Sequence, residues 1–488
     1  MRSWSSFSDI KDDTFFSYLR SQRRLISGAL AFSILLFLLL KYAFPYPDLF
    51  VDSSNYVTWA AHNFTVAYRP LGYAHFLQAV HFVIPSAFFT VLVQYAGFVC
   101  STLFLLLSAD YLFGLRTKLK LPILLALLCN PLLIFEANLI SSDSWFCSLS
   151  VAWFTTCLWL LKKPGWLILA LQLLFLYLCF QVRYTAMLYP LIAVASFLLC
   201  PAKMIYRLTG ITLVAAVILF SIEQQMAINE KETGTRVFSG FSGWQAANNA
   251  LYCYKHIDMK TEDLPDEQTR IIDQCTKIYI DSVTRTGSIG AAYLWDPHSP
   301  LKKYLNICAH RDHSDYLIAW FTASKPLGDY GRYIITHYPK TFTQYFLLPN
   351  TANFFYPGLE VLANYDYSNM VLLPDVKQWF GFQADHLDCI YPFLQERLMY
   401  LCPATILAIN MFSILSLIYF IFKKDKINPG TRRLLIIWCL FYLGYMLFSI
   451  LASVIFIRYI SILSVVCIVM PFVFLKQKEI TDKANGDM

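Results

Sequence analysis

The chain alternates long apolar stretches with short polar segments. A helix needs about 20 mostly apolar residues to cross the ~30 Å hydrocarbon core of a membrane, because unsatisfied backbone groups are too costly in lipid. Ten stretches follow this pattern: residues 25–44, 85–113, 121–139, 144–161, 165–182, 185–200, 208–226, 401–422, 434–453 and 457–475. The sequence therefore predicts an α-helical polytopic membrane protein with about ten transmembrane helices.

The apolar pattern stops between residues 228 and 400, where turn-forming pairs such as Asp296-Pro297 and Pro357-Gly358 appear. We expect three parts: a transmembrane region at 1–227 with a first outer loop at 45–84, a mainly helical soluble outer domain at 228–400, and a second transmembrane region with a cytoplasmic tail at 401–488. The first stretch is expected to be a retained anchor, because no small-residue cleavage site follows it.

Composition supports the same class. Of 488 residues, 57% are hydrophobic and 15% are charged, whereas a soluble globular domain has roughly 25% charged residues. The formal charge of +7 comes mainly from the inner loops and does not indicate a nucleic-acid partner. Residues 228–400 contain 15 Lys and Arg against 19 Asp and Glu, a net charge of −4, so the outer domain is mildly acidic.

Loop charges predict the orientation, since Lys and Arg accumulate on the cytoplasmic side of short loops. With the N-terminus inside, the inner segments hold most of the basic residues: Arg20, Arg23, Arg24, Arg116, Lys118, Lys120, Lys162, Lys163, Lys203, Arg207, Lys423, Lys424, Lys426, Arg432, Arg433, Lys476, Lys478 and Lys483. The short outer segments hold Arg69, Arg183 and Arg458, besides Lys41 near the end of the first stretch. Both termini are expected in the cytoplasm.

Asp52 opens the first outer loop, and Tyr56 and Trp59 follow it at helical spacing. This pattern predicts a short amphipathic helix along the membrane face. Taken alone, Asp52 fits an N-cap, because Asp accepts hydrogen bonds from free amides and favours the positive end of the helix dipole.

Asp143 is a second acid on the same side, in Ser141-Ser-Asp-Ser-Trp145 at the outer mouth of the fourth stretch. Glu136 lies about two turns before it. Acids at membrane depth are costly and usually mark functional sites, although Asp143 also fits a helix cap.

Arg183 and Arg458 face the same side as these acids, and Arg69 lies in the first outer loop. A single arginine there is explained by a side chain that extends to lipid headgroups. Three together indicate a bound anion, because the planar guanidinium engages two phosphate oxygens. A carboxylate and arginines on one face therefore supply a proton acceptor and cations for an anion.

In their order along the chain, these motifs resemble the pattern of GT-C fold glycosyltransferases, in the group of protein mannosyltransferases and lipid A aminoarabinose transferases. The resemblance is carried by Asp52 followed by Tyr56, Arg69-Pro-Leu-Gly-Tyr-Ala-His-Phe76, Ser-Ser-Asp143-Ser, Gln-Val-Arg183-Tyr and Ile-Arg458-Tyr459. It covers the first seven stretches well, the last ones weakly, and the outer domain only in position and size.

The resemblance implies an inverting enzyme that moves a sugar from a polyprenyl-phosphate-linked donor to a hydroxyl of a lipid, glycan or protein acceptor. Asp52 would be the general base, and Asp143 corresponds to the acidic position of the second outer loop. Ser53 follows Asp52, so neither an Asp-Glu pair nor an Asp-x-Asp metal motif is present, and we expect no metal or other cofactor. The remaining assignments are Arg69, Arg183 and Arg458 for the donor phosphate and Tyr56, Tyr73, Tyr184 and Tyr459 for the substrate pocket.

Other residues leave alternatives open. Cys253, Cys275, Cys308 and Cys389 fall in the outer domain and allow three disulfide pairings. The segment 243–254 combines aromatic and amide side chains, which suits sugar stacking or packing on the membrane region.

Two other functions remain as alternatives: a ligase or polymerase of lipid-linked glycans, and a transporter of lipid-linked sugars. A transporter is disfavoured because the chain has no internal repeat and its acids gather at one face. The expected location is the bacterial inner membrane, with the active site on the periplasmic or extracellular face, and the endoplasmic reticulum membrane is the alternative.

Overall fold

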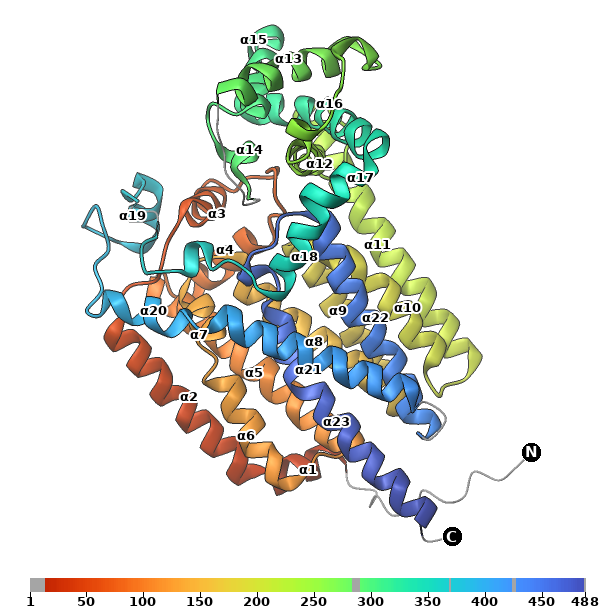
Figure 1. Ribbon diagram of the computed structural model, residues 1–488. Helices are drawn as coiled ribbons and strands as arrows, with labels where there is room; N and C mark the ends of the chain where they lie inside the picture. Colours follow the sequence, from red (N-terminus) through yellow and green to blue (C-terminus); the bar gives the residue numbers. More distant parts are fainter. Residues whose placement is uncertain (1–13, 283–289, 368–369, 424–426, 487–488) are drawn as a thin grey trace.

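The computed structural model describes residues 14–282, 290–367, 370–423 and 427–486. These residues form helices and connecting loops, with no strand and two isolated bridges, Asp48–Leu139 and Gly358–Phe456. Long helices make a bundle, and shorter helices make a separate layer over one end of it (Figure 1). The α-helical class predicted from the sequence is confirmed.

Within the described parts of the chain, six segments are long and apolar enough to cross a membrane: α2 (Arg23–Ala43), α5 (Ala87–Phe113), α8 (Ser142–Lys162), α11 (Met204–Thr233), α22 (Pro429–Ala452), and Pro392–Phe422, which comprises α20 (Pro392–Met399) and α21 (Cys402–Phe422). The helices α6 (Thr117–Leu128) and α7 (Pro131–Asn138) meet at 41° and form a seventh span if they count as one. The protein is therefore an α-helical membrane protein.

Three shorter apolar segments occupy the other predicted positions: α9 (Trp166–Val182), Tyr184–Leu199 with α10 (Tyr189–Leu199), and Ser461–Gln477 within α23 (Ser461–Gly486). With 10 to 17 residues each, these segments are apolar but shorter than the helices that are long enough to cross a membrane. The count of ten spans stays a prediction.

Helix α8 is the centre of the bundle, since 94% of its most apolar stretch is buried, against 28% for α2 and 22% for α11. Some of its hydroxyl side chains are satisfied within the helix: Ser148 donates to Ser144 O, and Thr155 donates to Val151 O. Such back-bonding lets polar residues face neighbouring helices in an apolar environment. Because α8 begins at Ser142, the middle of the bundle's outer end carries Asp143.

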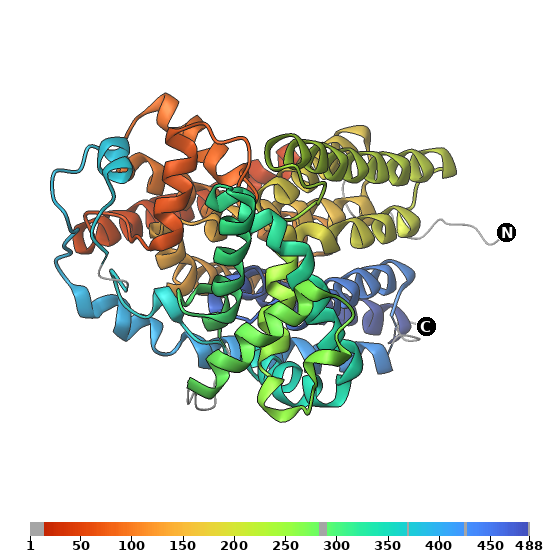
Figure 2. The same cartoon turned by 90° about the horizontal axis from the view of Figure 1, so that it is seen from above.

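The outer layer consists of α12 (Ser242–Leu251), α13 (Glu267–Ser282), α14 (Ala292–Trp295), α15 (Pro300–Asp312) and α16 (Tyr316–His337). They surround a core of their own that includes Trp244, Trp320 and Tyr330. A Cβ at Gly243 would lie 1.6 Å from the carbonyl oxygen of Ser324, so α12 and α16 touch through their backbones. Seen from above, this layer lies over the middle of the bundle (Figure 2).

Residues from 348 to 400 pack differently from the rest of the predicted outer domain. The short helices α17 (Pro339–Phe342) and α18 (Leu348–Phe355) lead back to the bundle, and α19 (Pro374–Phe380) lies beside the first outer loop (Figure 1). Phe354, Leu362 and Val376 belong to the bundle's core rather than to that of α12–α16. The predicted outer domain at 228–400 thus contains two parts with different cores.

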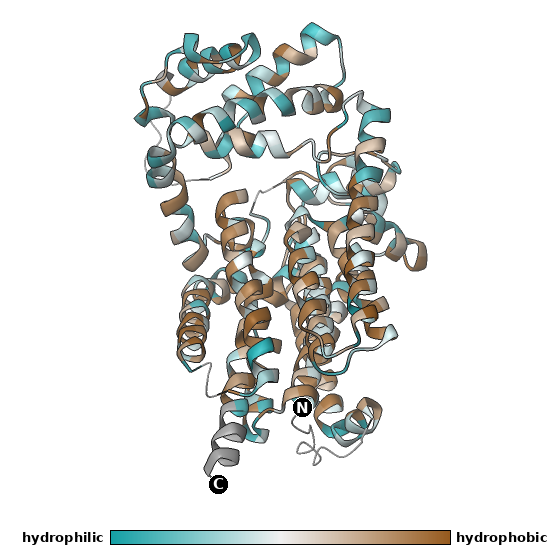
Figure 3. Cartoon of the chain, turned by 90° about the vertical axis from the view of Figure 1, so that its right-hand side faces the viewer, coloured by the Kyte–Doolittle hydropathy of each residue, from teal (hydrophilic) through white to brown (hydrophobic). Residues whose placement is uncertain are grey.

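The two ends of the described chain lie together, with α1 (Phe15–Ser21) and the end of α23 on the side opposite to α12–α16 (Figure 1). Apolar residues dominate the bundle helices, whereas the outer layer mixes polar and apolar residues (Figure 3). This arrangement matches the expected orientation in which both termini share one side.

The first outer loop folds as α3 (Val51–Ala61) and α4 (Gly72–Val83). The expected helix after Asp52 is present, but seven of its eleven residues are buried, so it does not lie open on the membrane face. Helix α19 covers it, and the Thr58 hydroxyl donates a 2.8 Å hydrogen bond to Asp375 Oδ2.

Candidate functional site

Asp52 lies inside the first turn of α3 and does not cap it. The N-cap position belongs to Phe50, whose backbone N–H donates to Ser53 Oγ over 3.1 Å, and Ser53 Oγ donates in turn to Ile140 O. The interpretation of Asp52 as an N-cap is therefore wrong, because α3 begins at Val51 and Asp52 is already its second residue. The carboxylate of Asp52 instead forms an ion pair with Arg69 Nη1.

Asp143 occupies the same place in α8. Ser141 is the N-cap residue, and its hydroxyl accepts from the Asp143 backbone N–H at 3.4 Å. The capping interpretation fails here too. The Asp143 side chain is 0% exposed and pairs with Arg183 Nη1 through Oδ1.

Arg458 joins these pairs. It lies in the 3₁₀ turn η7 (Ile457–Tyr459) before α23, with 6% of its side chain exposed. Its Nη1 is 3.0 Å from Asp143 Oδ2, its Nη2 is 3.9 Å from Asp52 Oδ2, and its Nε is 2.8 Å from Glu360 Oε2. One guanidinium therefore contacts acids from three separate segments of the chain.

We call the resulting cluster the ion network: Asp52, Arg69, Asp143, Arg183, Glu360 and Arg458. Its three arginines and three carboxylates balance in charge. Removing charges from water is costly unless each has a partner in good geometry, and every member here has one. All five charged residues predicted from the sequence lie in this one cluster, although their roles stay predictions.

A glycine allows two parts of the ion network to meet. A Cβ at Gly72 would lie 2.4 Å from the backbone oxygen of Gln181, so the start of α4 touches the end of α9 directly. Only glycine permits this contact without a shift of the backbone. It brings the loop that carries Arg69 next to Arg183, the residue after α9.

Electrostatics keeps Asp52 ionised. Burial raises the pKa of this carboxyl, but Arg69, Arg458 and Arg183 together outweigh burial and hold the pKa below its ordinary value. In Arg69, burial lowers the pKa of the guanidinium, and the charge of Asp52 more than compensates, so the pKa is raised. Asp52 is thus a carboxylate at neutral pH.

Glu360 is the member of the ion network that the sequence analysis missed. It has a φ of +50°, which is uncommon for a residue other than glycine and is a feature found at functional sites. The available signal was a lone acid between Leu359 and Val361 in an apolar run. Nothing local indicates that it meets Arg458.

The tyrosines assigned to the pocket take different places. Tyr56 donates to Ser142 Oγ over 3.2 Å, and Tyr459 lies between two cations, with its ring 4.8 Å from the Arg183 guanidinium carbon and 4.7 Å from that of Arg458. The other two lie further back.

Tyr73 is fully buried behind Tyr56, with ring centroids 5.0 Å apart, and its hydroxyl donates to Gln94 Oε1. Tyr184 packs edge-on against Phe238 at 5.0 Å. The geometry gives Tyr459 direct contact with the ion network, and Tyr56 reaches it through Ser142, whose hydroxyl also accepts from Arg183 Nη1 at 3.4 Å. Tyr73 supports Tyr56 from behind.

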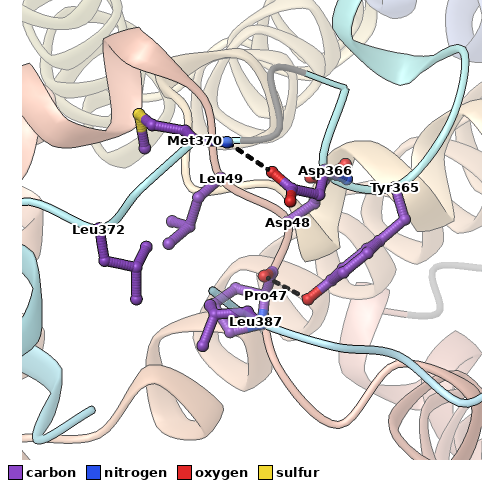
Figure 4. Close-up of a pocket in the computed structure, with 8 residues that line it drawn as sticks. All are labelled: Pro47, Asp48, Leu49, Tyr365, Asp366, Met370, Leu372 and Leu387. Atoms are coloured by element: carbon purple, nitrogen blue, oxygen red, sulfur yellow. Dashed lines mark hydrogen bonds between the residues drawn. The ribbon is translucent and has the colours of Figure 1, made fainter. Parts of the chain in front are cut away.

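Another buried acid, Asp48, lies near the start of the first outer loop beside a small pocket (Figure 4). It accepts from the Asp366 backbone N–H at 3.1 Å and from Gln395 Nε2 at 3.2 Å. Burial raises its pKa to about 7 despite these bonds. The pocket has a volume of about 10 Å³, which is room for one water molecule at most, so it is a packing gap and not a substrate site.

A larger groove of about 420 Å³ lies between α4, α8, α9 and α11. Phe76, Trp145 and Leu178 line its apolar wall, and Gln224 and Gln225 line part of the α11 side. The groove also reaches Gly72 and Val182, the latter directly before Arg183. A long apolar ligand in this groove would therefore have one end beside the ion network.

Two further features of the described residues are their lack of metal-binding clusters and the state of their cysteines. Among the described residues, no group of three or more His, Cys, Asp and Glu side chains is placed to hold a metal ion. All thirteen cysteines are free, including the four of the outer region.

The fold and the ion network define an α-helical membrane protein with a charged site at one end of its bundle. Comparisons with protein-family models, with curated proteins and with solved structures find no match for the chain.

Proposed function

We propose that this protein is a glycosyltransferase that moves a sugar from a polyprenyl-phosphate-linked donor to an acceptor hydroxyl, with inversion, at the periplasmic face of a bacterial inner membrane. The observation that carries the proposal is the ion network, in which two carboxylates from the first and second outer loops share three arginines. A base for a hydroxyl and cations for a phosphate are what this reaction requires.

Asp52 serves as the general base. Both of its arginine contacts go to Oδ2, and within the described residues no donor engages Oδ1. As the acceptor oxygen attacks the anomeric carbon, its proton passes to Oδ1. The bond from the anomeric carbon to the phosphate oxygen breaks, and its electron pair leaves with the lipid phosphate.

The arginines stabilise the departing phosphate. Over the part of the chain that is described, Arg69 and Arg183 donate through Nη1, which leaves other guanidinium nitrogens for further acceptors. A guanidinium with remaining donors suits an incoming phosphate better than a lysine would, because its donors lie in one plane. Asp143 holds Arg183 and Arg458 in place.

The groove supports a lipidic donor. Its apolar wall, formed by residues such as Phe76 and Trp145, suits an isoprenoid chain, and its end at Val182 lies beside Arg183. A polyprenyl phosphate lying in the groove would present its phosphate to the arginines and its chain to the membrane.

The test is a transfer assay on purified protein in lipid nanodiscs, with undecaprenyl-phosphate-linked mannose and aminoarabinose as donors and release of undecaprenyl phosphate as the readout. Asp52→Asn preserves size and removes the proton acceptor, so turnover should fall roughly 10²-fold or more. The matched control is Asp375→Asn, which removes a carboxylate bonded to the same helix at Thr58. Normal turnover in folded Asp52→Asn protein would refute the proposal for Asp52.

A further inference from the structure

The outer layer contains a group of aromatic rings, some of which are buried in its core while others are exposed to solvent. Trp244 and Trp320 are fully buried and stack at 3.8 Å between ring centroids, which explains them as packing residues. Trp295 on α14 and Tyr316 at the start of α16 belong to the same group, but they are 38% and 55% exposed. Packing alone accounts poorly for two large rings that remain open to solvent.

Lys302 on α15 lies among these rings. Its Nζ is 4.4 Å from the Trp320 centroid, 5.4 Å from that of Trp295 and 5.3 Å from that of Tyr316, and it donates to the Tyr316 hydroxyl over 2.6 Å. Burial lowers the pKa of Lys302 to about 8. The rings and the ammonium therefore hold each other in fixed positions through cation–π contacts.

This aromatic group reaches the ion network. The ring of Trp295 lies 6.1 Å from that of Tyr68 and 5.9 Å from that of Phe241, centroid to centroid. The guanidinium carbon of Arg69 is 5.4 Å from the Trp295 centroid, and Arg69 pairs with Asp52. A single guanidinium thus separates an exposed tryptophan from the candidate base.

We propose that Trp295 and Tyr316, held by Lys302, form a platform that binds a carbohydrate acceptor. This inference rests on the proposed function and narrows its acceptor class from lipid, glycan or protein to glycan. A sugar has an apolar C–H face that packs on an aromatic ring and a hydroxyl edge that needs polar partners. The platform offers both, because Lys302 and the Asn55–Tyr68 pair supply polar groups beside the rings.

The place of the platform argues against a lipid acceptor. Trp295 and Tyr316 belong to the outer layer, whereas the apolar groove lies between bundle helices. A glycan on Trp295 would approach Asp52 from the outer side while the donor lipid approaches Arg183 from the groove. Its hydroxyl would then meet the anomeric carbon at Asp52 Oδ1, with the balance of bonds and proton given above.

The experiment uses the full chain in nanodiscs on an array of immobilised glycans of defined structure. The wild type should bind at least one glycan class, and Trp295→Ala should weaken that binding by roughly tenfold or more, as expected for loss of a main stacking partner. Tyr316→Ala, on a different helix, should also weaken it, and Trp295→Phe should restore part of it. The matched control is Trp166→Ala. It removes an exposed tryptophan at the start of α9, the end of that helix away from Arg183.

Failure of the platform and failure of the proposed function give different results. If only the platform is wrong, the wild type binds no glycan on the array, or Trp295→Ala binds as the wild type does, while undecaprenyl phosphate is still released from the donor. If only the proposed function is wrong, glycan binding depends on Trp295 but no donor is turned over. If both hold, Trp295→Ala retains slow release of undecaprenyl phosphate to water and loses transfer to the bound glycan class.

Discussion

The ion network and the aromatic platform face each other across Arg69, and they are built in opposite ways. The network is buried at Asp52, Asp143 and Arg458 and half-buried at its other members, and it pairs every charge, drawing its members from segments far apart in the chain. The platform is half open, and its two exposed rings lie on the edge of a core that Trp244 and Trp320 already fill. Removing a member of the network leaves a buried charge without its partner, whereas removing an exposed ring leaves a core intact. Stability and function are therefore coupled in the first and separable in the second.

The largest effect is expected from Arg458→Ala. It removes a cation that contacts Asp143 and Glu360 at 3.0 and 2.8 Å, and breaking a buried pair costs about 3–5 kcal/mol. The apparent melting temperature in nanodiscs should fall clearly, and Arg458→Lys should recover part of the loss because it retains the charge. Arg236→Ala, whose ion pairs with Glu223 and Glu230 are on the surface, should melt like the wild type. Equal melting of Arg458→Ala and wild type would mean that the network does not hold the bundle's outer end.

Asp48 extends the comparison to an acid with no arginine partner among the described residues. Its pKa is raised from 3.8 to about 7, so the folded state binds the proton more tightly than the unfolded state does. The free energy of unfolding that this proton binding adds is present at low pH and is lost as the pH rises through about 7. The loss between pH 4 and 8 should amount to roughly 2–4 kcal/mol, discounted from the full shift. Asp48→Asn should melt at nearly the same temperature at pH 5 and pH 8. A wild type with no such pH dependence would contradict the raised pKa.

The opposite sign is expected for Asp52, whose pKa is lowered. Its contribution to stability is present above the ordinary pKa of an aspartate and is lost only when the pH falls through the lower folded value. Loss of activity from protonation of Asp52 should therefore begin below pH 4. An activity profile that falls between pH 5 and 6 in the wild type, and keeps that fall in Asp48→Asn, would count against an ionised Asp52 as the base.

A smaller effect is expected when Arg183 changes to Lys. The charge near Asp143 survives, but the planar donors are lost, so the apparent affinity for undecaprenyl-phosphate-linked sugar should weaken by about tenfold. Arg183→Ala should weaken it further. Unchanged donor affinity in both variants would return Arg183 to the simpler interpretation of a side chain near lipid headgroups.

The smallest effect on stability is expected from Trp295→Ala. Substitutions at exposed sites usually change stability by no more than about 0.5 kcal/mol, and the buried pair Trp244–Trp320 remains. The melting temperature of Trp295→Ala protein should stay close to that of the wild type, while its glycan binding falls. Melting as low as that of Trp320→Ala, which removes a core ring, would show that the platform and the core are one unit.

The location of the charged residues was predictable because it follows from local rules. Hydropathy and the positive-inside rule placed Asp52, Asp143 and the three outer arginines at one end of the bundle, and the structure has them there in one cluster. Helix caps were predicted wrongly, since α3 and α8 each begin two residues earlier than a capping acid requires, and their N-cap residues are Phe50 and Ser141. A cap depends on the exact residue at which a helix begins, and a sequence pattern defines that boundary only to within one or two residues.

Long-range contacts were beyond the sequence. Arg458 meets Asp143 across 315 residues of chain, and no spacing rule links them. The platform shows the same limit. The sequence pattern singled out the segment 243–254, which includes Trp244, whereas Trp295 and Trp320 lie near Trp244 only because α14 and α16 pack on α12. Patterns identify which residues are unusual, and packing decides which of them meet.

The wide spacing of the ion network also bears on how the protein is made. Asp143 is followed by Arg183 only 40 residues later, so these two can pair soon after their helices emerge from the ribosome. Glu360 and Arg458 come much later, and Arg458 joins three acids at once. Between the synthesis of Glu360 and that of Arg458, the network holds three carboxylates against two arginines, and its candidate base lacks part of its surroundings. Nascent chains therefore carry an incomplete site through most of their synthesis, and any chemistry at Asp52 would begin only once the segment around Arg458 has docked.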